Sequence, residues 1–114
     1  MKRLYLIRHG KSSWKNPDLT DFERPLNDRG KRDAPGMGKR LKERKVYPDL
    51  MLSSPAKRAL KTAKMIAEEI GFPKKQIKTD KAIYLADVST LVEVIRTIDN
   101  SCHQVMLFGH NPGF

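Results

Sequence analysis

The amino-acid sequence predicts an α/β protein with three layers, in which helices cover both faces of a mostly parallel central sheet. Two observations lead to this prediction, one for the fold class and one for the number of domains. Short apolar runs alternate along the chain with amphipathic segments of helical length, which is the pattern of strand–helix–strand units. The chain has 114 residues, near the common size of one domain, so we expect a single domain over residues 1–114.

The first strand is predicted at Leu4 to Ile7, where apolar and aromatic residues lead directly into Arg8 and His9. Residues 12–27 follow, and they are rich in charges and turn-forming residues, including two prolines. Such a long connection in a compact domain is more often a functional loop than an accident.

The first helix is predicted from about Arg32 to Arg44, with Asn27 or Asp28 as a possible N-cap. Pro35 lies inside this segment among several glycines. Because proline lacks a backbone N–H and crowds the preceding turn, we expect the helix to be disrupted near that residue.

The second strand, at Leu50 to Leu52, leads into the helix with the clearest signals. Ser54 is predicted as its N-cap, Pro55 as its first residue and Gly71 as its stop. The apolar stripe between them consists of Ala59, Leu60, Ala63, Ile66, Ala67 and Ile70.

The C-terminal part repeats the alternation. We predict a weak strand at Ile77 to Thr79, a helix from about Ser89 to Ile98 and a buried strand at Gln104 to Phe108. That last strand runs into Gly109, His110 and Asn111.

The composition is basic, with 23 Lys and Arg against 13 Asp and Glu, a formal charge of +10. This excess favours an anionic partner, such as a phosphate ester, a phosphoprotein or a nucleic acid. No aromatic residues interleave with the basic stretch 39–45, so the sequence does not favour nucleic-acid binding. Cys102 is the only cysteine, and the N-terminal apolar run is too short for a signal peptide or a membrane span. We therefore expect a cytoplasmic protein that does not enter the membrane.

Three predicted strands end in polar residues, and parallel strands bring their carboxyl ends to one edge of the sheet, where α/β proteins bind ligands. A fourth polar group follows near the start of a helix, where the backbone also attracts anions. Two histidines and two arginines are thus predicted to converge on an anion site: Arg8, His9, Arg58 and His110.

Four segments resemble the signatures of the histidine phosphatase superfamily, also called the phosphoglycerate mutase-like superfamily. They are LIRHGKSSW at 6–14, RPLNDRGKRDA at 24–34, SSPAKRALKTA at 53–63 and FGHNPG at 108–113. The lysine after Arg-His-Gly, the Ser-Ser-Trp that follows and the small size look most like SixA-type phosphohistidine phosphatases.

The resemblance implies that His9 is a nucleophile that becomes transiently phosphorylated. It also implies that Arg8, Arg58 and His110 hold the phosphoryl oxygens. Fixed cations suit this task because negative charge spreads over those oxygens during transfer, and arginine can bind two of them at once. A neutral imidazole can attack phosphorus without help from a metal. The resemblance therefore implies no cofactor, and no His, Cys or acidic pair has the spacing of a zinc or calcium site.

Four further residues carry two interpretations each. Ser12 and Lys15 follow the nucleophile and either contact substrate or belong to a solvated loop. Asn111 either offers its backbone N–H to phosphate or forms a turn before a proline. Asp87 is the local candidate for the general acid that many superfamily members use, or it caps the helix that follows.

We thus expect a metal-independent phosphatase that acts on phosphohistidine in a protein. The alternatives are a small-molecule phosphomonoesterase of the same superfamily and a non-catalytic basic domain that binds anions or nucleic acid. In the superfamily the sheet continues beyond the Gly-His-Asn-Pro segment with a further helix and strands. The resemblance therefore implies that this chain is truncated at its C-terminus, with its first strand left at the sheet edge.

Overall fold

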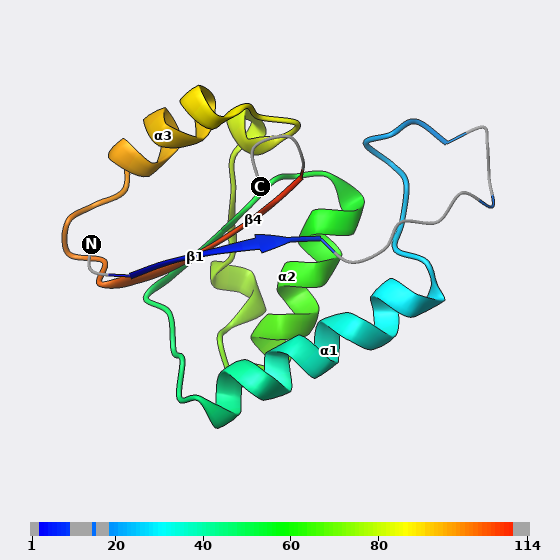
Figure 1. The fold of residues 1–114 in the computed structure, drawn as a ribbon, viewed down its shortest axis with the longest axis horizontal. Helices are drawn as coiled ribbons and strands as arrows, with labels where there is room; N and C mark the ends of the chain where they lie inside the picture. Colours follow the sequence, from blue (N-terminus) through cyan, green and yellow to red (C-terminus); the bar gives the residue numbers. More distant parts are fainter. Residues whose placement is uncertain (1–2, 10–14, 16–18, 111–114) are drawn as a thin grey trace.

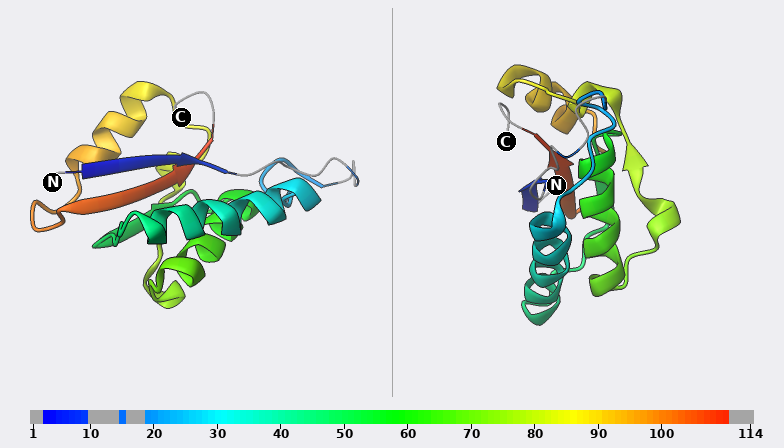
Figure 2. Two further views of the ribbon diagram at one scale, coloured as in Figure 1. Left: turned by 60° about the horizontal axis from the view of Figure 1, so that its bottom comes forward. Right: turned by 90° about the vertical axis from the view of Figure 1, so that its right-hand side faces the viewer.

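The computed structural model describes residues 3–9, 15 and 19–110, and it confirms the three-layer α/β architecture (Figure 1). Four parallel strands form one sheet in the order β1-β4-β2-β3. The strands are β1 (Arg3–Arg8), β2 (Leu50–Ser53), β3 (Lys78–Thr79) and β4 (Gln104–Gly109). Helices α1 (Asp28–Glu43) and α2 (Lys57–Ile70) lie on one side of the sheet, and α3 (Val88–Arg96) lies on the other (Figure 2). In the described ranges, no helix combines the length and apolar character needed to cross a membrane.

The core has two parts because β4 is buried on both faces. Met106 and Phe108 pack into the cluster formed with α2, which includes Ile66, and Leu107 packs into the cluster formed with α3, which includes Leu91. Successive side chains of a strand point to opposite faces, so one strand supplies both layers. This is why Val105–Phe108 form a continuous apolar run in the sequence.

Helix α1 is longer than predicted, and the expected disruption at Pro35 is wrong. The helix begins at Asp28 and continues through Pro35 to Glu43. Its start is fixed by Asn27, whose side chain accepts a hydrogen bond from the backbone N–H of Gly30 at 2.8 Å, which confirms one of the two predicted caps. Pro35 removes one backbone hydrogen-bond donor, but the chain stays helical on both sides of it, and the buried face of α1, which includes Gly38, packs closely against α2.

Helix α2 begins two residues later than predicted. Ala56, with ψ of 141°, is still extended and is the N-cap, so Pro55 lies before the helix instead of at its first position. The Ser54 side chain accepts a hydrogen bond from the backbone N–H of Ala56 at 3.2 Å, within a turn that precedes the helix. Gly71 ends α2 in the left-handed conformation, with φ of 77°, as predicted.

The four strands and helix α3 lie within two residues of their predicted bounds. Asp87 is the N-cap of α3, and its side chain accepts a hydrogen bond from the backbone N–H of Thr90 at 2.8 Å. In the described sheet, β1 is an edge strand that pairs with β4, and Leu6 on it is half exposed.

Candidate functional site

The sheet register brings the ends of three strands together. Arg8 pairs with Gly109 across β1 and β4, and the backbone N–H of His9 donates to the Gly109 carbonyl at 3.1 Å. His9 and His110 are therefore the first residues beyond two adjacent strands. On the other side of β4, the backbone N–H of Ser54 donates to the Phe108 carbonyl at 2.9 Å. The predicted convergence of polar strand ends is thus present in the fold.

Arg58 lies at the second position of α2 and is buried, with only 4% of its surface exposed. Its Nε donates a hydrogen bond to Nε2 of His9 at 3.2 Å. Because an arginine nitrogen can only donate, the His9 Nε2 accepts through its lone pair. The imidazole nitrogen with nucleophilic character therefore points at a buried guanidinium.

His110 completes the cluster from the other side. Its ring centroid lies 5.1 Å from that of His9, and its Nε2 shares a hydrogen bond with the Ser54 hydroxyl at 2.8 Å. The side chain is 2% exposed, and its Nδ1 has no hydrogen-bond partner among the described residues. Burial lowers the pKa of His110 to about 4, and the positive charge of the neighbouring Arg58 adds to this effect. His110 is therefore neutral near pH 7.

Asp21, in the long segment before α1, holds the other end of the Arg58 guanidinium. Its Oδ2 accepts from Arg58 Nη2 at 3.0 Å, and its backbone carbonyl accepts from Arg58 Nη1. The hydroxyl of Tyr84 also donates to Oδ2, at 2.5 Å, and Arg24 donates to Oδ1 at 2.8 Å. One carboxylate thus joins the loop, α2 and the segment before α3.

The pKa values around this carboxylate follow from its partners. Burial alone would raise the pKa of Asp21, but hydrogen bonds from Tyr84 and Arg58 and the charges of Arg58 and Arg24 lower it below its usual value. Burial, reinforced by the Asp21 hydrogen bond and charge, raises the pKa of Tyr84. Near neutral pH the carboxylate is ionised and the phenol retains the proton it donates.

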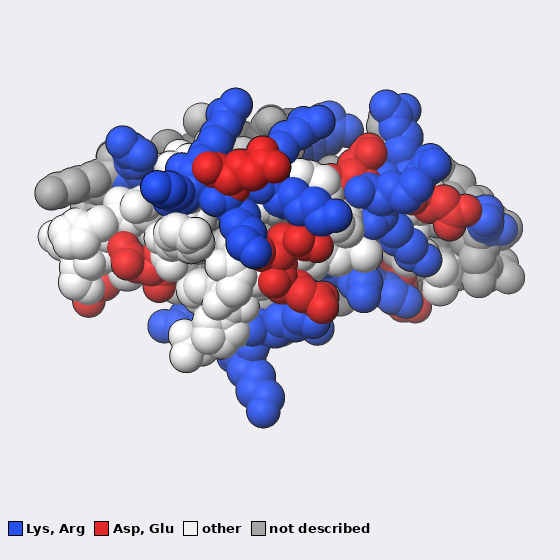
Figure 3. Space-filling model, turned by 90° about the horizontal axis from the view of Figure 1, so that it is seen from below, with Lys and Arg blue, Asp and Glu red and all other residues white. Residues whose placement is uncertain are grey.

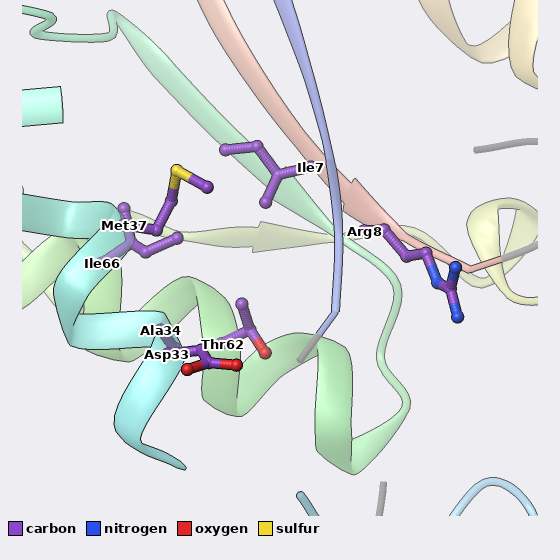
Figure 4. A pocket seen from close by; sticks show the side chains of 7 residues that line it. All are labelled: Ile7, Arg8, Asp33, Ala34, Met37, Thr62 and Ile66. Carbon is purple, nitrogen blue, oxygen red and sulfur yellow. The ribbon is translucent and has the colours of Figure 1, made fainter. Parts of the chain in front are cut away.

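Three of the four residues predicted for the core of the site are in contact or adjacent: His9, Arg58 and His110. The fourth, Arg8, lies at the same end of β1 but has an exposed side chain. It leaves the strand on the side opposite to Ile7, as alternate residues of a strand do (Figure 4).

Of the peripheral predicted residues, Lys15 and Asp87 belong to the part of the chain that the structure describes. Ser12 and Asn111 lie outside the described residues. Lys15 is exposed, and its Nζ lies 4.0 Å from a carboxylate oxygen of Asp28. Asp87 is exposed and, as the cap of α3, has a lowered pKa because the backbone and side chain of Thr90 and the hydroxyl of Ser89 donate hydrogen bonds to it. An ionised carboxylate in this role is poorly suited to protonate a leaving group.

Two residues of the cluster were missed by the sequence reasoning, Asp21 and Tyr84. The length of the segment 12–27 had indicated a functional loop, but no local pattern distinguished Asp21 from its other acidic residues. Ser54 was expected only as a helix cap, whereas its hydroxyl also contacts His110. Within residues 3–9, 15 and 19–110, no group of three His, Cys, Asp or Glu side chains could hold a metal ion together.

A mostly apolar cavity of about 100 Å³ lies between β1, α1 and α2. Ile7 points toward the cavity, and Met37 of α1 and Ile66 of α2 line it (Figure 4). The hydrogen-bonded cluster of His9, Arg58 and His110 does not line it. Arg8 also lines the cavity, so one of the four predicted site residues borders it.

Basic side chains spread over the face formed by α1 and α2, with acidic side chains among them (Figure 3). Some of these charges pair, as Arg29 and Asp33 do at 3.6 Å and Lys74 and Glu68 at 3.2 Å. A mixed, solvated helix surface accounts for this pattern better than a continuous nucleic-acid groove.

Comparisons with known proteins agree with this geometry. The model of the histidine phosphatase superfamily (branch 1) matches residues 4–84. A structure from Agrobacterium tumefaciens, assigned as the phosphohistidine phosphatase SixA, superposes with a TM-score of 0.89 at 33% identity, over 98% of this chain and 71% of that one. The protein histidine phosphatase SixA in complex with tungstate superposes with a TM-score of 0.85 at 23% identity, over 96% of this chain and 69% of that one.

The chain is also similar to two curated proteins over part of their length. Phosphoglycerate mutase 1 of Saccharomyces cerevisiae is 38% identical over 71 residues, which cover 60% of this chain but only 29% of the mutase. An uncharacterised chloroplastic protein of Arabidopsis thaliana is 30% identical over 99% of this chain and 56% of its own length. The chain thus spans between about a third and just over half of these two curated relatives.

Proposed function

This chain belongs to the histidine phosphatase superfamily, and from that premise we propose that it is a metal-independent phosphatase that works through a phosphohistidine on His9. The single observation that carries the proposal is the 3.2 Å contact between Arg58 Nε and His9 Nε2, beside the buried His110. It places a nucleophilic lone pair and a fixed cation together at the carboxyl end of the sheet.

The first step forms a bond between His9 Nε2 and phosphorus while the bond from phosphorus to the leaving group breaks. The leaving group takes the electron pair and then a proton from solvent. In the second step water attacks phosphorus, the phosphorus–nitrogen bond breaks, and its electron pair returns to Nε2. The water proton passes to solvent, and inorganic phosphate is released. Division of the reaction into two displacements avoids one difficult direct attack by water.

Arg58 has a role in both steps of this mechanism. In the free enzyme its Nε–H is bonded to the attacking lone pair of His9. When phosphorus binds to that lone pair, the same N–H is released and can bind a phosphoryl oxygen. The guanidinium therefore stabilises the transition state of phosphoryl transfer more than it stabilises the free enzyme. This difference accelerates the reaction.

We assign to His110 a hydrogen bond to the same phosphoryl oxygens, which it makes as an uncharged group. Its low pKa keeps it uncharged, and its buried Nδ1 makes no bond to the described residues. A polar nitrogen left without a partner in such a place is costly, and a phosphoryl oxygen can remove that cost if Nδ1 carries the proton. We assign Arg8 to an outer position on the phosphoryl group, and Ser12, Lys15 and Asn111 to contacts with the substrate.

The proposed substrate is phosphohistidine in a protein. A histidine nitrogen leaves phosphorus more easily than an alkoxide, so such a substrate reduces the need for a general acid. The N-cap role of Asp87 fits this substrate class, although Asp87 is still the candidate acid for an ester substrate. The 33% identity with the Agrobacterium SixA protein supports the same choice.

The alternative is a small phosphate ester, which the similarity to the yeast phosphoglycerate mutase favours. A phosphohistidine peptide and a panel of small phosphomonoesters, assayed side by side with the same enzyme sample, distinguish the two. A higher kcat/KM on the peptide supports the protein substrate, and the reverse order supports the ester.

The mechanism itself is tested with His9→Ala and a matched control, His103→Ala. His103 is exposed and lies at the opposite end of β4. We expect hydrolysis to fall by roughly a thousandfold or more in His9→Ala and to persist in His103→Ala. We also expect activity to survive a metal chelator and to be inhibited by vanadate. Activity that persists in His9→Ala would refute the proposal.

A further inference from the structure

We propose that Asp21 is a positioning residue, which orients the Arg58 guanidinium so that its Nε faces the nucleophilic nitrogen of His9. The inference rests on the proposed function only for the identity of the bound anion, a phosphoryl group. It assigns a role to a segment in which the sequence had indicated no site residue beyond Ser12 and Lys15.

The planar guanidinium of Arg58 is oriented by contacts at its terminal nitrogens. Arginine presents five N–H groups in a rigid planar fork, so two bonds to its terminal nitrogens fix the direction of its Nε–H. Asp21 accepts from both terminal nitrogens, through its backbone carbonyl at Nη1 and its Oδ2 at Nη2. The remaining edge of the fork, which contains Nε, is thereby turned toward His9.

Asp21 is itself held in place by its neighbours. Its Oδ2 accepts from Tyr84 and its Oδ1 from Arg24, so both carboxylate oxygens have defined directions. The adjacent Phe22 packs edge-on against the Tyr84 ring, with centroids 5.2 Å apart, and its carbonyl accepts from the backbone N–H of Lys57 at 3.1 Å. The turn that carries Asp21 is thus attached to the start of α2, beside Arg58.

A competing role for the same contact has the opposite consequence. If the carboxylate merely occupied the anion site, its negative charge would compete with phosphate for Arg58. Removal of the carboxylate would then strengthen phosphate binding for two reasons. Arg58 would be available to phosphate, and the site would carry one negative charge less. If Asp21 positions Arg58, its removal weakens phosphate binding even though the site becomes more positive. The two roles therefore differ in sign.

The test compares Asp21→Asn with Glu23→Gln, using inorganic phosphate as the probe and titration calorimetry as the measurement. Glu23→Gln makes the same change of charge two residues away in the same turn, at an exposed position. We expect the dissociation constant for phosphate to rise about tenfold or more in Asp21→Asn, since bonds to charged groups are involved, and to change less than twofold in Glu23→Gln. We expect kcat to fall more than KM rises. Unchanged or tighter phosphate binding in Asp21→Asn would overturn the proposal.

A second measurement does not depend on activity or on phosphate. In the ligand-free protein, the Nε–H of Arg58 should give a slowly exchanging signal in a ¹H–¹⁵N spectrum, identified by its loss in Arg58→Lys. We expect that signal to persist in Glu23→Gln and to disappear in Asp21→Asn. Its persistence in Asp21→Asn would overturn the positioning role, even if the wild-type chain proved to be an active phosphatase. Conversely, an inactive wild type with the expected signals would refute only the proposed function.

Tyr84→Phe keeps the proposal testable if Asp21→Asn fails to fold. This variant retains the carboxylate and removes one bond that orients it. We expect phosphate binding to weaken in the same direction by a smaller factor, about twofold to fivefold. Unchanged or tighter binding in a folded Tyr84→Phe would contradict the positioning role.

Discussion

Acidification should destabilise this fold through His110 in particular. Its folded-state pKa of about 4 lies below the ordinary value of 6.5, because the ring is buried beside Arg58. As the pH falls below 6.5, the unfolded chain takes up a proton at this histidine while the folded chain does not. The stability that depends on neutral His110 is therefore fully present above pH 6.5, and it decreases as the pH falls toward 4.

The size of the effect follows from the two pKa values. Proton uptake by the unfolded state alone costs the fold about 2 kcal/mol at pH 5 and about 3 kcal/mol at pH 4. A loss of about 2 kcal/mol is a large part of the 5–15 kcal/mol typical of a folded domain, so the measurement is well within range.

The assay is urea denaturation followed by circular dichroism at pH 7.5 and pH 5, for the wild type and His110→Gln. Glutamine places an amide near the position of Nε2, beside Ser54, but does not titrate. The wild type should lose about 2 kcal/mol more than His110→Gln between the two pH values, whatever the absolute stability of the variant. His103→Gln, an exposed control, should keep the wild-type loss. Equal losses in the wild type and His110→Gln would refute the reasoning.

Two further predictions concern packing and the cap of α3. A Cβ at Gly38 would lie 2.7 Å from Cβ of Glu69, so Gly38→Ala should destabilise the fold by about 1–3 kcal/mol in thermal or urea denaturation. Gly36→Ala in the same helix meets nothing within 4 Å and should stabilise it by about 0.5–1 kcal/mol, and a cost at Gly36 equal to that at Gly38 would contradict this account. Asp87→Asn preserves a cap but removes an acid, so hydrolysis of a phosphohistidine peptide should be unchanged. A selective loss on ester substrates in Asp87→Asn would instead identify Asp87 as the general acid.

The layers of the fold were predictable because they depend on local periodicity. The stripe of α2, with Ile66 and Ala67 inward, and the apolar run of β4 both follow from spacing within a few residues. The errors occurred where packing overrides a local signal. Pro35 lies inside α1, which packs against α2, and Ser54 lies in the turn before α2, where its hydroxyl contacts His110.

For the site, the sequence determined the residues at the strand ends, because parallel strands must share one edge. His9 and His110 are therefore neighbours in the fold for the same reason that they end apolar runs in the sequence. Only the tertiary structure decided what surrounds Arg58. Asp21 reaches it across 37 residues, and Tyr84 reaches Asp21 across 63. No local pattern specifies contacts of that range, because they exist only once the loop, α2 and the segment before α3 have packed together.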